Sequence, residues 1–507
     1  MMTPDKLQDQ RNLDARFAGG LAWTVGAKWA TQVITWTSLL AVTRLLSTSD
    51  YGVGEMAGTL TVVSNVMAEF GVGTAVLHMP ELSRKALAQL HLFSCLLCTG
   101  VFALASLASP LVASFFHTPH VTFFIVNNSL LLLTGFEAVP MGLLARDMDY
   151  RRLSLLEATG VVIQSVVTVC TAWLGWGFWA LLAGNAAGKV TVTILVCSWK
   201  HVGFAWPRWA DIRTAAELGR QSAIGRTAWA LYTQADGIVV GRILGASVLG
   251  NYRIAMNLAS APAEKVSTLL MRTATPLFAN VKDDHSLVRR YYLILTEILT
   301  LIVMPLMTGL AIVSPLAIPV VFGAKWTAAI PPVRWLALFM IVRTLGTLTE
   351  QVLISQKMTR FTMRMSIFNF IVMPVAFVAG AMWGGTGGVA AAWLALAPFT
   401  IIPLLIILLR TIRLPYRDFV AALVPSVVGS AAMCVAVLAV RQWLLPASWP
   451  AKSLLVAQVA VGGAVYGAVL MGAFRQRVLR YVRFLQDMRK GKKSPSPALT
   501  PLQVETE

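Results

Sequence analysis

Hydrophobic residues stand in long blocks along nearly the whole chain, and Arg and Lys punctuate them. The blocks are roughly 20–25 residues long, which as α-helix is enough to cross a ~30 Å hydrocarbon layer. The composition agrees, since 57% of the 507 residues are hydrophobic and 13% are charged. Soluble proteins have about 45–50% apolar and about 25% charged residues. The sequence therefore predicts an all-α polytopic membrane protein and excludes a soluble enzyme, a secreted disulfide scaffold and a nucleic-acid-binding protein.

The blocks predict about fourteen transmembrane helices, at 20–43, 51–76, 88–114, 121–145, 155–175, 178–198, 221–241, 247–271, 293–317, 328–350, 362–382, 387–409, 419–440 and 453–474. Cytoplasmic loops of membrane proteins carry an excess of Lys and Arg. With the N-terminus inside, 30 of the 42 Lys and Arg fall in cytoplasmic segments, and five fall outside: Arg44, Arg242, Lys325, Arg441 and Lys452. Both termini are therefore predicted to be cytoplasmic.

Two segments match at an offset of 198 residues: 44–52 and 242–250 share Arg, Leu, Ser and Gly at equivalent places. Each half of such a repeat holds six helices, so both halves enter the membrane in the same sense. We expect two six-helix lobes related by a pseudo-twofold axis along the membrane normal. The predicted organisation is a cytoplasmic N-terminus at 1–18, an N-lobe at 19–200, a linker at 201–220, a C-lobe at 221–410, two peripheral helices at 411–474 and a basic cytoplasmic tail at 475–507.

Charged residues also fall inside the predicted spans. Seven are basic (Lys28, Lys189, Arg226, Arg253, Lys265, Arg334 and Arg343) and seven are acidic (Glu55, Glu69, Glu137, Asp236, Glu264, Glu297 and Glu350). An uncompensated charge at mid-bilayer costs at least ~2.5–3.5 kcal/mol, so each needs a partner or water. The equal numbers leave two interpretations open, mutual structural pairing and contact with a substrate.

Helical spacing places many of these charges on polar faces. These faces are Lys28, Gln32 and Thr35; Glu55, Gly58, Asn65 and Glu69; Arg226, Trp229, Thr233 and Asp236; Arg253, Asn257, Ser260 and Glu264; and Arg343, Thr347 and Glu350. Five polar faces cannot all contact lipid, so we expect them to line a hydrated cavity between the lobes. The candidate substrate-binding residues are Lys28, Arg226, Arg253, Arg343, Gln32 and Asn257.

A cationic cavity is suited to an anionic substrate such as a phosphate or diphosphate, because Arg and Lys bind phosphate oxygens. Asp236, Glu69 and Glu55 are candidates for coupling transport to an H⁺ or Na⁺ gradient. The sequence predicts no other cofactor and no metal site. The Cys95–Cys98 spacing lies within a span and is interpreted as two small apolar residues, and the six His show no metal-ligand spacing.

Short runs spread over residues 15–440 resemble the polysaccharide transporter branch of the multidrug/oligosaccharidyl-lipid/polysaccharide (MOP) exporter superfamily, the Wzx-type O-antigen and capsule flippases and their colanic-acid-exporter-like group. The runs are Arg44–Leu46, Asp50–Gly52, Glu69–Ala75, Pro140–Arg151, Leu249–Tyr252, Pro276–Ala279 and Val321–Trp326. The resemblance implies two six-helix lobes plus two helices around a V-shaped cavity. It also implies that an undecaprenyl-diphosphate-linked oligosaccharide is flipped outward across the inner membrane of a bacterium, with cavity Arg and Lys binding the diphosphate. Pathway glycosyltransferases or a polysaccharide polymerase would be its partners.

Four other functions compete with this interpretation. A drug/cation antiporter of the same superfamily needs an anionic cavity, whereas the polar faces here are rich in Lys and Arg. A lipid II flippase shares the fourteen helices and the cationic cavity. A polymerase usually has a large outward loop, and a glycosyltransferase needs an acidic cluster, for which Asp283 and Asp284 in a cation-rich cytoplasmic loop are the only adjacent pair. We therefore expect a transporter rather than an enzyme.

Overall fold

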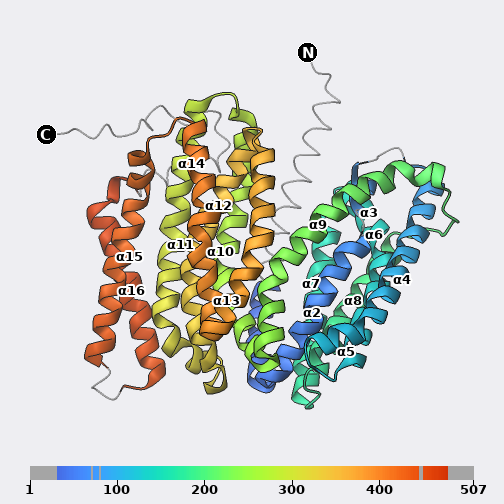
Figure 1. Ribbon diagram of the computed structural model, residues 1–507, viewed down its shortest axis with the longest axis horizontal. Helices are drawn as coiled ribbons and strands as arrows, with labels where there is room; N and C mark the ends of the chain where they lie inside the picture. Colours follow the sequence, from blue (N-terminus) through green and yellow to red (C-terminus); the bar gives the residue numbers. More distant parts are fainter. Residues whose placement is uncertain (1–30, 70–71, 79–81, 445–448, 478–507) are drawn as a thin grey trace. The chain divides into compact units, whose positions relative to one another are not determined.

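The computed structural model describes residues 31–69, 72–78, 82–444 and 449–477, and its regular structure in these ranges is entirely helical (Figure 1). In chain order, a helix over residues 31–45 is followed by α2 (Thr48–Glu69), α3 (Val72–His78), α4 (Arg84–Phe115), α5 (Val121–Asn128), α6 (Leu131–Arg146), α7 (Tyr150–Trp173), α8 (Trp179–Trp199), α9 (Trp209–Leu244), α10 (Ala246–Val281), α11 (His285–Val321), the 3-10 helix η1 (Ala324–Ala329), α12 (Ile330–Ser355), α13 (Thr359–Thr400), α14 (Ile402–Thr411), α15 (Tyr416–Leu444) and α16 (Ala451–Ala473).

The chain divides into two compact units. Of the described residues, one contains those up to residue 254 with 321–329 and 370–389, and the other contains 255–320, 330–369 and those from residue 390 onward. The division falls within α10, a single continuous helix.

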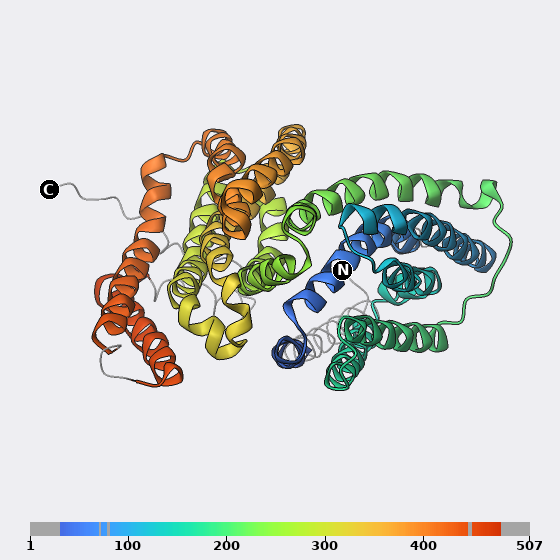
Figure 2. The ribbon, with the colours of Figure 1, turned by 60° about the horizontal axis from the view of Figure 1, so that its bottom comes forward.

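Small residues allow close helix packing in the first unit. The neighbouring helices α7 and α8 approach where a Cβ added at Gly188 would lie 2.8 Å from the carbonyl oxygen of Gly160 (Figures 1 and 2). In membranes, helix association depends on such van der Waals contact, because lipid tails are as apolar as the side chains. Elsewhere in this unit, a cluster of buried apolar side chains joins α3, α4, α6 and α9. It includes Val76, Leu90, Val139 and Ile212.

The second unit is held together by apolar contacts and by isolated buried hydrogen bonds. Val313 of α11 packs against Met433 and Val437 of α15. On the same two helices, the Ser426 hydroxyl donates to Thr300 Oγ1 at 3.0 Å. The helices α15 and α16 lie side by side (Figures 1 and 2), and Tyr466 of α16 donates a 2.7 Å hydrogen bond to the Leu301 carbonyl of α11.

Most described helices suit a bilayer, and this confirms the predicted all-α, multi-span membrane fold. In the described part of the chain, nine helices are long and apolar enough to cross a membrane. The long helices α2, α9 and α10 are not among the nine, and they carry three of the polar faces identified in the sequence. Their polarity is what lining a hydrated cavity requires. The number fourteen itself stays a prediction.

One apolar stretch, Thr359–Thr411, is 53 residues long and contains a turn. Gly385 has φ +55°, a left-handed conformation that glycine adopts without a Cβ penalty. The chain folds back there, since a Cβ added at Gly380 would lie 2.5 Å from the Gly388 carbonyl oxygen. The turn separates the two spans predicted at 362–382 and 387–409.

The two repeat segments found in the sequence contact each other in the first unit. Thr48 Oγ1 and Ser247 Oγ lie 2.7 Å apart, at the starts of α2 and α10. A Cβ at Gly52 would lie 1.8 Å from the Ala246 carbonyl oxygen, and one at Gly250 would lie 2.2 Å from that of Thr48. In the repeat, with its offset of 198 residues, Thr48 is equivalent to Ala246 and Gly52 is equivalent to Gly250. The contact is therefore reciprocal, as expected around a local twofold axis.

Candidate functional site

The structure places the predicted site residues unevenly. Lys28 lies outside the described residues. Arg226 lies in α9, but its side chain is outside the described part. Gln32 is half-buried in the helix 31–45, and Asn257 is exposed on α10. Arg253, Arg343 and the carboxylates Asp236, Glu55 and Glu69 belong to the described part of the chain.

Three predicted site residues form one buried cluster in the first unit. Arg253 is 8% exposed and Asp236 is 1% exposed. The Arg253 guanidinium lies 3.6 Å (Nε) from Glu55 Oε2 and 3.9 Å (Nη1) from Asp236 Oδ1, and its Nη2 donates to Gln234 Oε1. The Tyr252 hydroxyl donates to Asp236 Oδ2 at 2.8 Å.

Local sequence makes room for this cluster. A Cβ added at Gly237 would lie 2.1 Å from Arg253 Nη2, so the glycine next to Asp236 allows the guanidinium to approach α9. One guanidinium and two carboxylates leave a formal charge of −1 when all three are ionised. The sequence assigned Arg253 to the substrate and the two acids to an ion, whereas the structure joins them in a single electrostatic unit.

Arg343 has a different environment in the second unit. Its Nη2 lies 3.5 Å from Glu264 Oε1, and the two side chains are 41% and 58% exposed. These two residues come from the polar faces of α12 and α10. The Arg343 guanidinium is thus weakly paired and accessible, unlike that of Arg253.

Some charges in the predicted spans are paired for structural reasons. Lys189 Nζ donates to Glu137 Oε2 at 2.6 Å, and the Thr193 hydroxyl donates to Glu137 Oε1 at 2.6 Å. Glu137 is 6% exposed, so this arrangement compensates a buried carboxylate between α6 and α8. Glu69 is partly buried at the end of α2, and Lys265 and Arg334 are exposed.

The acidic pair Asp283 and Asp284 contains a helix cap. Asp284 Oδ1 accepts hydrogen bonds from the Ser286 hydroxyl and from the backbone N–H groups of Ser286 and Leu287, in the first turn of α11. These bonds, the Ser286 hydroxyl first, hold the pKa of Asp284 below its usual range. Across the described residues, no group of three or more His, Cys, Asp or Glu side chains is arranged to hold a metal ion.

One contact of functional interest was not predicted. Lys325 Nζ donates to the carbonyl oxygens of Arg44 (2.9 Å) and Leu46 (2.7 Å), and Trp326 Nε1 donates to that of Thr43 (2.8 Å). The segment around η1 thereby caps the end of the helix 31–45. Both partners belong to runs on which the family resemblance rests, but nothing local in the sequence relates positions about 280 residues apart.

Comparison with known proteins identifies the family. A family model described as "Polysaccharide biosynthesis protein" matches residues 41–331, which is more than half of the chain. The chain belongs to this family. The expectation of a transporter rather than an enzyme is confirmed by this family and by the relatives described next.

Similar sequences cover most of the chain. The lipopolysaccharide biosynthesis protein WzxC of Escherichia coli K12 is 24% identical over 78% of this chain and 83% of its own length. The teichuronic acid biosynthesis protein TuaB of Bacillus subtilis 168 is 23% identical over 93% and 99%, respectively. The succinoglycan biosynthesis transport protein ExoT of Rhizobium meliloti 1021 is 26% identical over 63% of this chain and 65% of its own length.

Solved structures share the fold. The lipid II flippase MurJ in an inward closed conformation superimposes with a TM-score of 0.68, 13% identity, and coverage of 89% of this chain and 99% of MurJ. An inward-facing multidrug resistance MATE family transporter of the MOP superfamily superimposes with a TM-score of 0.58 and 13% identity. The match covers 76% of this chain and 95% of that transporter. The predicted MOP-type fold is therefore confirmed, while identities this low carry no information on substrate.

Proposed function

We propose that this protein is a flippase that moves an undecaprenyl-diphosphate-linked oligosaccharide repeat unit across the cytoplasmic membrane. The unit would supply a surface polysaccharide: an exopolysaccharide, a capsule or an O-antigen. Translocation would proceed by alternating access of two lobes around a cationic cavity. The sugar would travel in the hydrated cavity while the polyprenyl chain stays in lipid, because hydroxyl groups are costly and apolar chains are favourable in hydrocarbon.

The observation that carries the proposal is the family match over residues 41–331. It favours a polysaccharide precursor over lipid II, because relatives named for polysaccharide pathways align over most of this chain, whereas the likeness to MurJ rests on the fold. The family match likewise favours a polysaccharide precursor over a cationic drug as the substrate, because the family is described by polysaccharide biosynthesis. We place the protein in the inner membrane of a bacterium with both termini cytoplasmic, where glycosyltransferases would supply the substrate and a polymerase would use it.

The proposed diphosphate site consists of the cations on the polar faces: Lys28, Arg226, Arg253 and Arg343, with Gln32 and Asn257 contacting sugar. Among the described guanidiniums, Arg343 supports this role through its exposure. Arg253 is compensated by Asp236 and Glu55, so its availability would depend on the charge of those acids.

That dependence gives a route to ion coupling. A proton or Na⁺ bound at Glu55, whose side chain is 30% exposed, would neutralise the extra negative charge of the cluster. Arg253 would then have one anionic partner fewer and more capacity to bind a diphosphate. Glu69 remains a second candidate for coupling, at the far end of α2.

Lipid analysis tests the function directly. Cells lacking the protein would be extracted, and undecaprenyl-diphosphate oligosaccharides would be identified by mass spectrometry. We expect one complete repeat unit to accumulate while surface polysaccharide is lost. Unchanged lipids together with intact surface polysaccharide would contradict the proposal and favour drug export.

Substitution tests the site. Lys28→Ala and Arg226→Ala are expected to abolish export at normal protein level, because each removes a cation from a polar face. Arg334→Ala serves as the matched control, since this exposed Arg lies at the start of α12 and outside the polar faces. Full export by both cavity variants would show that the cationic-cavity assignment is wrong.

A further inference from the structure

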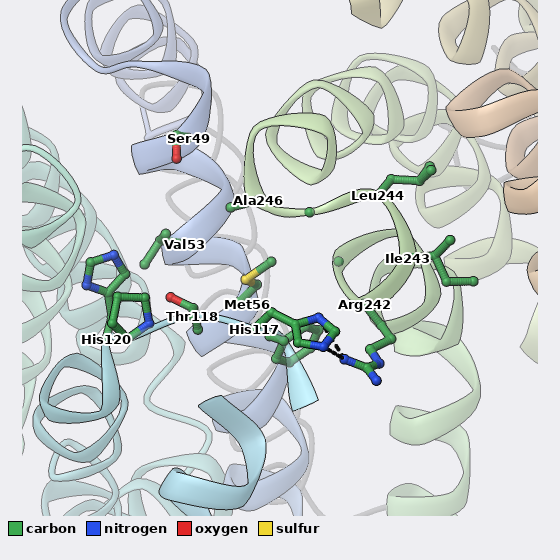
Figure 3. Close-up of a pocket in the computed structure, with 14 residues that line it drawn as sticks. Ser49, Val53, Met56, His117, Thr118, His120, Arg242, Ile243, Leu244 and Ala246 are labelled. Atoms are coloured by element: carbon green, nitrogen blue, oxygen red, sulfur yellow. Dashed lines mark hydrogen bonds between the residues drawn. The ribbon is translucent and has the colours of Figure 1, made fainter. Parts of the chain in front are cut away.

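A cavity in the first unit lies among the segments predicted to face outward. Its volume is about 430 Å³, within the range of small-molecule sites. It is bounded by the start of α2, the loop between α4 and α5, and the junction of α9 and α10 (Figure 3). The charged, imidazole and hydroxyl side chains of its lining are Ser49, His117, Thr118, His120 and Arg242.

The polar lining is rich in nitrogen donors. Figure 3 shows the Arg242 guanidinium turned toward the His117 ring, and His120 on the other side of the cavity. Arg242 Nη1 donates to the Phe115 carbonyl oxygen at 2.8 Å and contacts the His117 ring nitrogens. A guanidinium has five N–H donors in a fork that matches carboxylate and phosphate oxygens. Its other N–H groups make no hydrogen bond to the described part of the chain.

No carboxylate lines the cavity. Arg242 has no carboxylate oxygen within 4.0 Å among the described residues, whereas the described cations Lys189 and Arg253 of the same unit each have one. The nearby Asp50 is occupied elsewhere, because its Oδ2 accepts hydrogen bonds from the backbone N–H and the hydroxyl of Ser47. The positive charge of Arg242 beside the cavity is thus met by no described carboxylate, but by the Phe115 carbonyl oxygen and by the Phe115 ring, whose centroid lies 5.2 Å from Cζ.

His117 is held there at a conformational cost. Its φ is +52°, a left-handed conformation that is disfavoured for L-residues. The turn after α4 has the hydrogen bonds of a helix C-cap, from His117 N to Ser114 O and from Thr118 N to Ala113 O. Glycine is the usual residue at this position of such a cap. Met148, Lys357 and Arg413 adopt the same conformation at the ends of other helices, so this cap recurs in the chain, and at His117 it places the imidazole ring beside the cavity.

We infer that this cavity binds a carboxylate or phosphate group of a carbohydrate ligand on the outward side of the membrane. Arg242 binds the anion, the His117 ring packs against the guanidinium and positions it, His120 adds a donor, and the hydroxyls of Ser49 and Thr118 bind sugar oxygens. The apolar side chains of the lining, among them Val53, Phe116 and Ile243, suit the C–H face of a sugar ring. The inference rests on the proposed function for the source of the ligand, an acidic sugar or the diphosphate of the translocated lipid.

Binding of simple probes tests the cavity without transport. The purified full chain in nanodiscs would be examined by saturation-transfer NMR with D-glucuronate and D-glucose, and by ³¹P line broadening with inorganic diphosphate. We expect glucuronate or diphosphate to bind, and glucose to bind at least tenfold more weakly. Glucuronate binding identifies an acidic sugar as the source, and diphosphate binding alone identifies the lipid headgroup. Arg242→Gln should weaken anion binding by about tenfold to a hundredfold, the effect of losing a charge-assisted hydrogen bond.

Two further variants separate binding from folding. Arg213→Gln removes an equal charge from an exposed surface pair with Glu217 on the same helix and should bind as the parent does. His117→Gly relieves the left-handed strain, so it should keep or raise the melting temperature while weakening anion binding. The inference is overturned if glucose binds as well as glucuronate, if Arg242→Gln binds as the parent does, or if the parent binds no probe. Lipid accumulation in cells lacking the protein would leave the flippase proposal standing in each of those cases.

Discussion

Replacing Gly52 by alanine adds one methyl group at the point where the two repeat segments cross. The new Cβ would lie 1.8 Å from the Ala246 carbonyl oxygen, 2.5 Å from its carbonyl carbon and 3.0 Å from its Cα. All three atoms are backbone, so no side chain can rotate away. The start of α2 or of α10 has to move to accommodate the methyl group.

The magnitude follows from two opposing effects. Forcing a methyl group into a packed contact costs typically about 1–3 kcal/mol and sometimes more. Alanine in a helix is favoured over glycine by roughly 0.5–1 kcal/mol. Gly58 lies in the same helix, and nothing is within 4 Å of its added Cβ. Gly52→Ala should therefore destabilise the fold on balance, and Gly58→Ala should leave it unchanged or more stable.

Thermal unfolding in nanodiscs, followed by intrinsic tryptophan fluorescence, measures the difference. We expect Gly52→Ala to melt below the parent and Gly58→Ala at or above it. Gly250→Ala should resemble Gly52→Ala, because its Cβ would lie 2.2 Å from the Thr48 carbonyl oxygen. Combining the two should cost less than the sum, since one displacement of the helices relieves both contacts. Equal melting temperatures for Gly52→Ala and Gly58→Ala would refute the close crossing.

Three more predictions concern the charged residues. Lys189→Met should destabilise the fold by about 2.5–3.5 kcal/mol, because it leaves the charge of the Glu137 carboxylate without a cation in the membrane. In thermal unfolding, the double variant with Glu137→Gln should recover part of the lost stability, and no recovery would show that the two residues are not coupled. Lys325→Met should cost about 0.5–1.5 kcal/mol, the net contribution of a typical hydrogen bond, by removing the donor of two carbonyl oxygens at a partly exposed helix end, and a melting temperature equal to that of the parent would contradict the cap. Arg343→Gln should reduce export of the polysaccharide at normal protein level, whereas Arg334→Gln on the same helix should not; equal export by both would remove Arg343 from the proposed site.

Properties that depend on local composition and period could be predicted from the sequence. Apolar blocks of bilayer length gave the all-α membrane class, because in hydrocarbon every backbone N–H and C=O must be satisfied within a helix. Short runs over residues 15–440 predicted the family, and the match between 44–52 and 242–250 predicted the internal repeat. The polar faces of α2, α9 and α10 followed from helical spacing alone, and these long helices are not among the nine helices of the described residues that are apolar enough to span a membrane.

The pairing of charges was decided by the tertiary structure. The sequence offered equal numbers of cations and carboxylates but no means of matching Arg253 with Asp236 and Glu55, or Lys189 with Glu137. Which of two oppositely charged groups meet depends on helix rotation and on distances of a few ångströms. Spacing along one helix does not contain that information.

What the sequence by itself determined is the set of groups that must avoid lipid, because the cost of burying a charge or a polar face belongs to each residue separately. What only the tertiary structure decided is which of these groups satisfy one another and which stay free. Lys325 donates to carbonyl groups at the end of the helix 31–45, including that of Arg44, which is 281 positions earlier in the sequence. Arg242, in contrast, lines an open cavity that contains no carboxylate. The physical reason is that Coulomb attraction and hydrogen bonding act over a few ångströms of space, and only the packed helices bring distant residues that close.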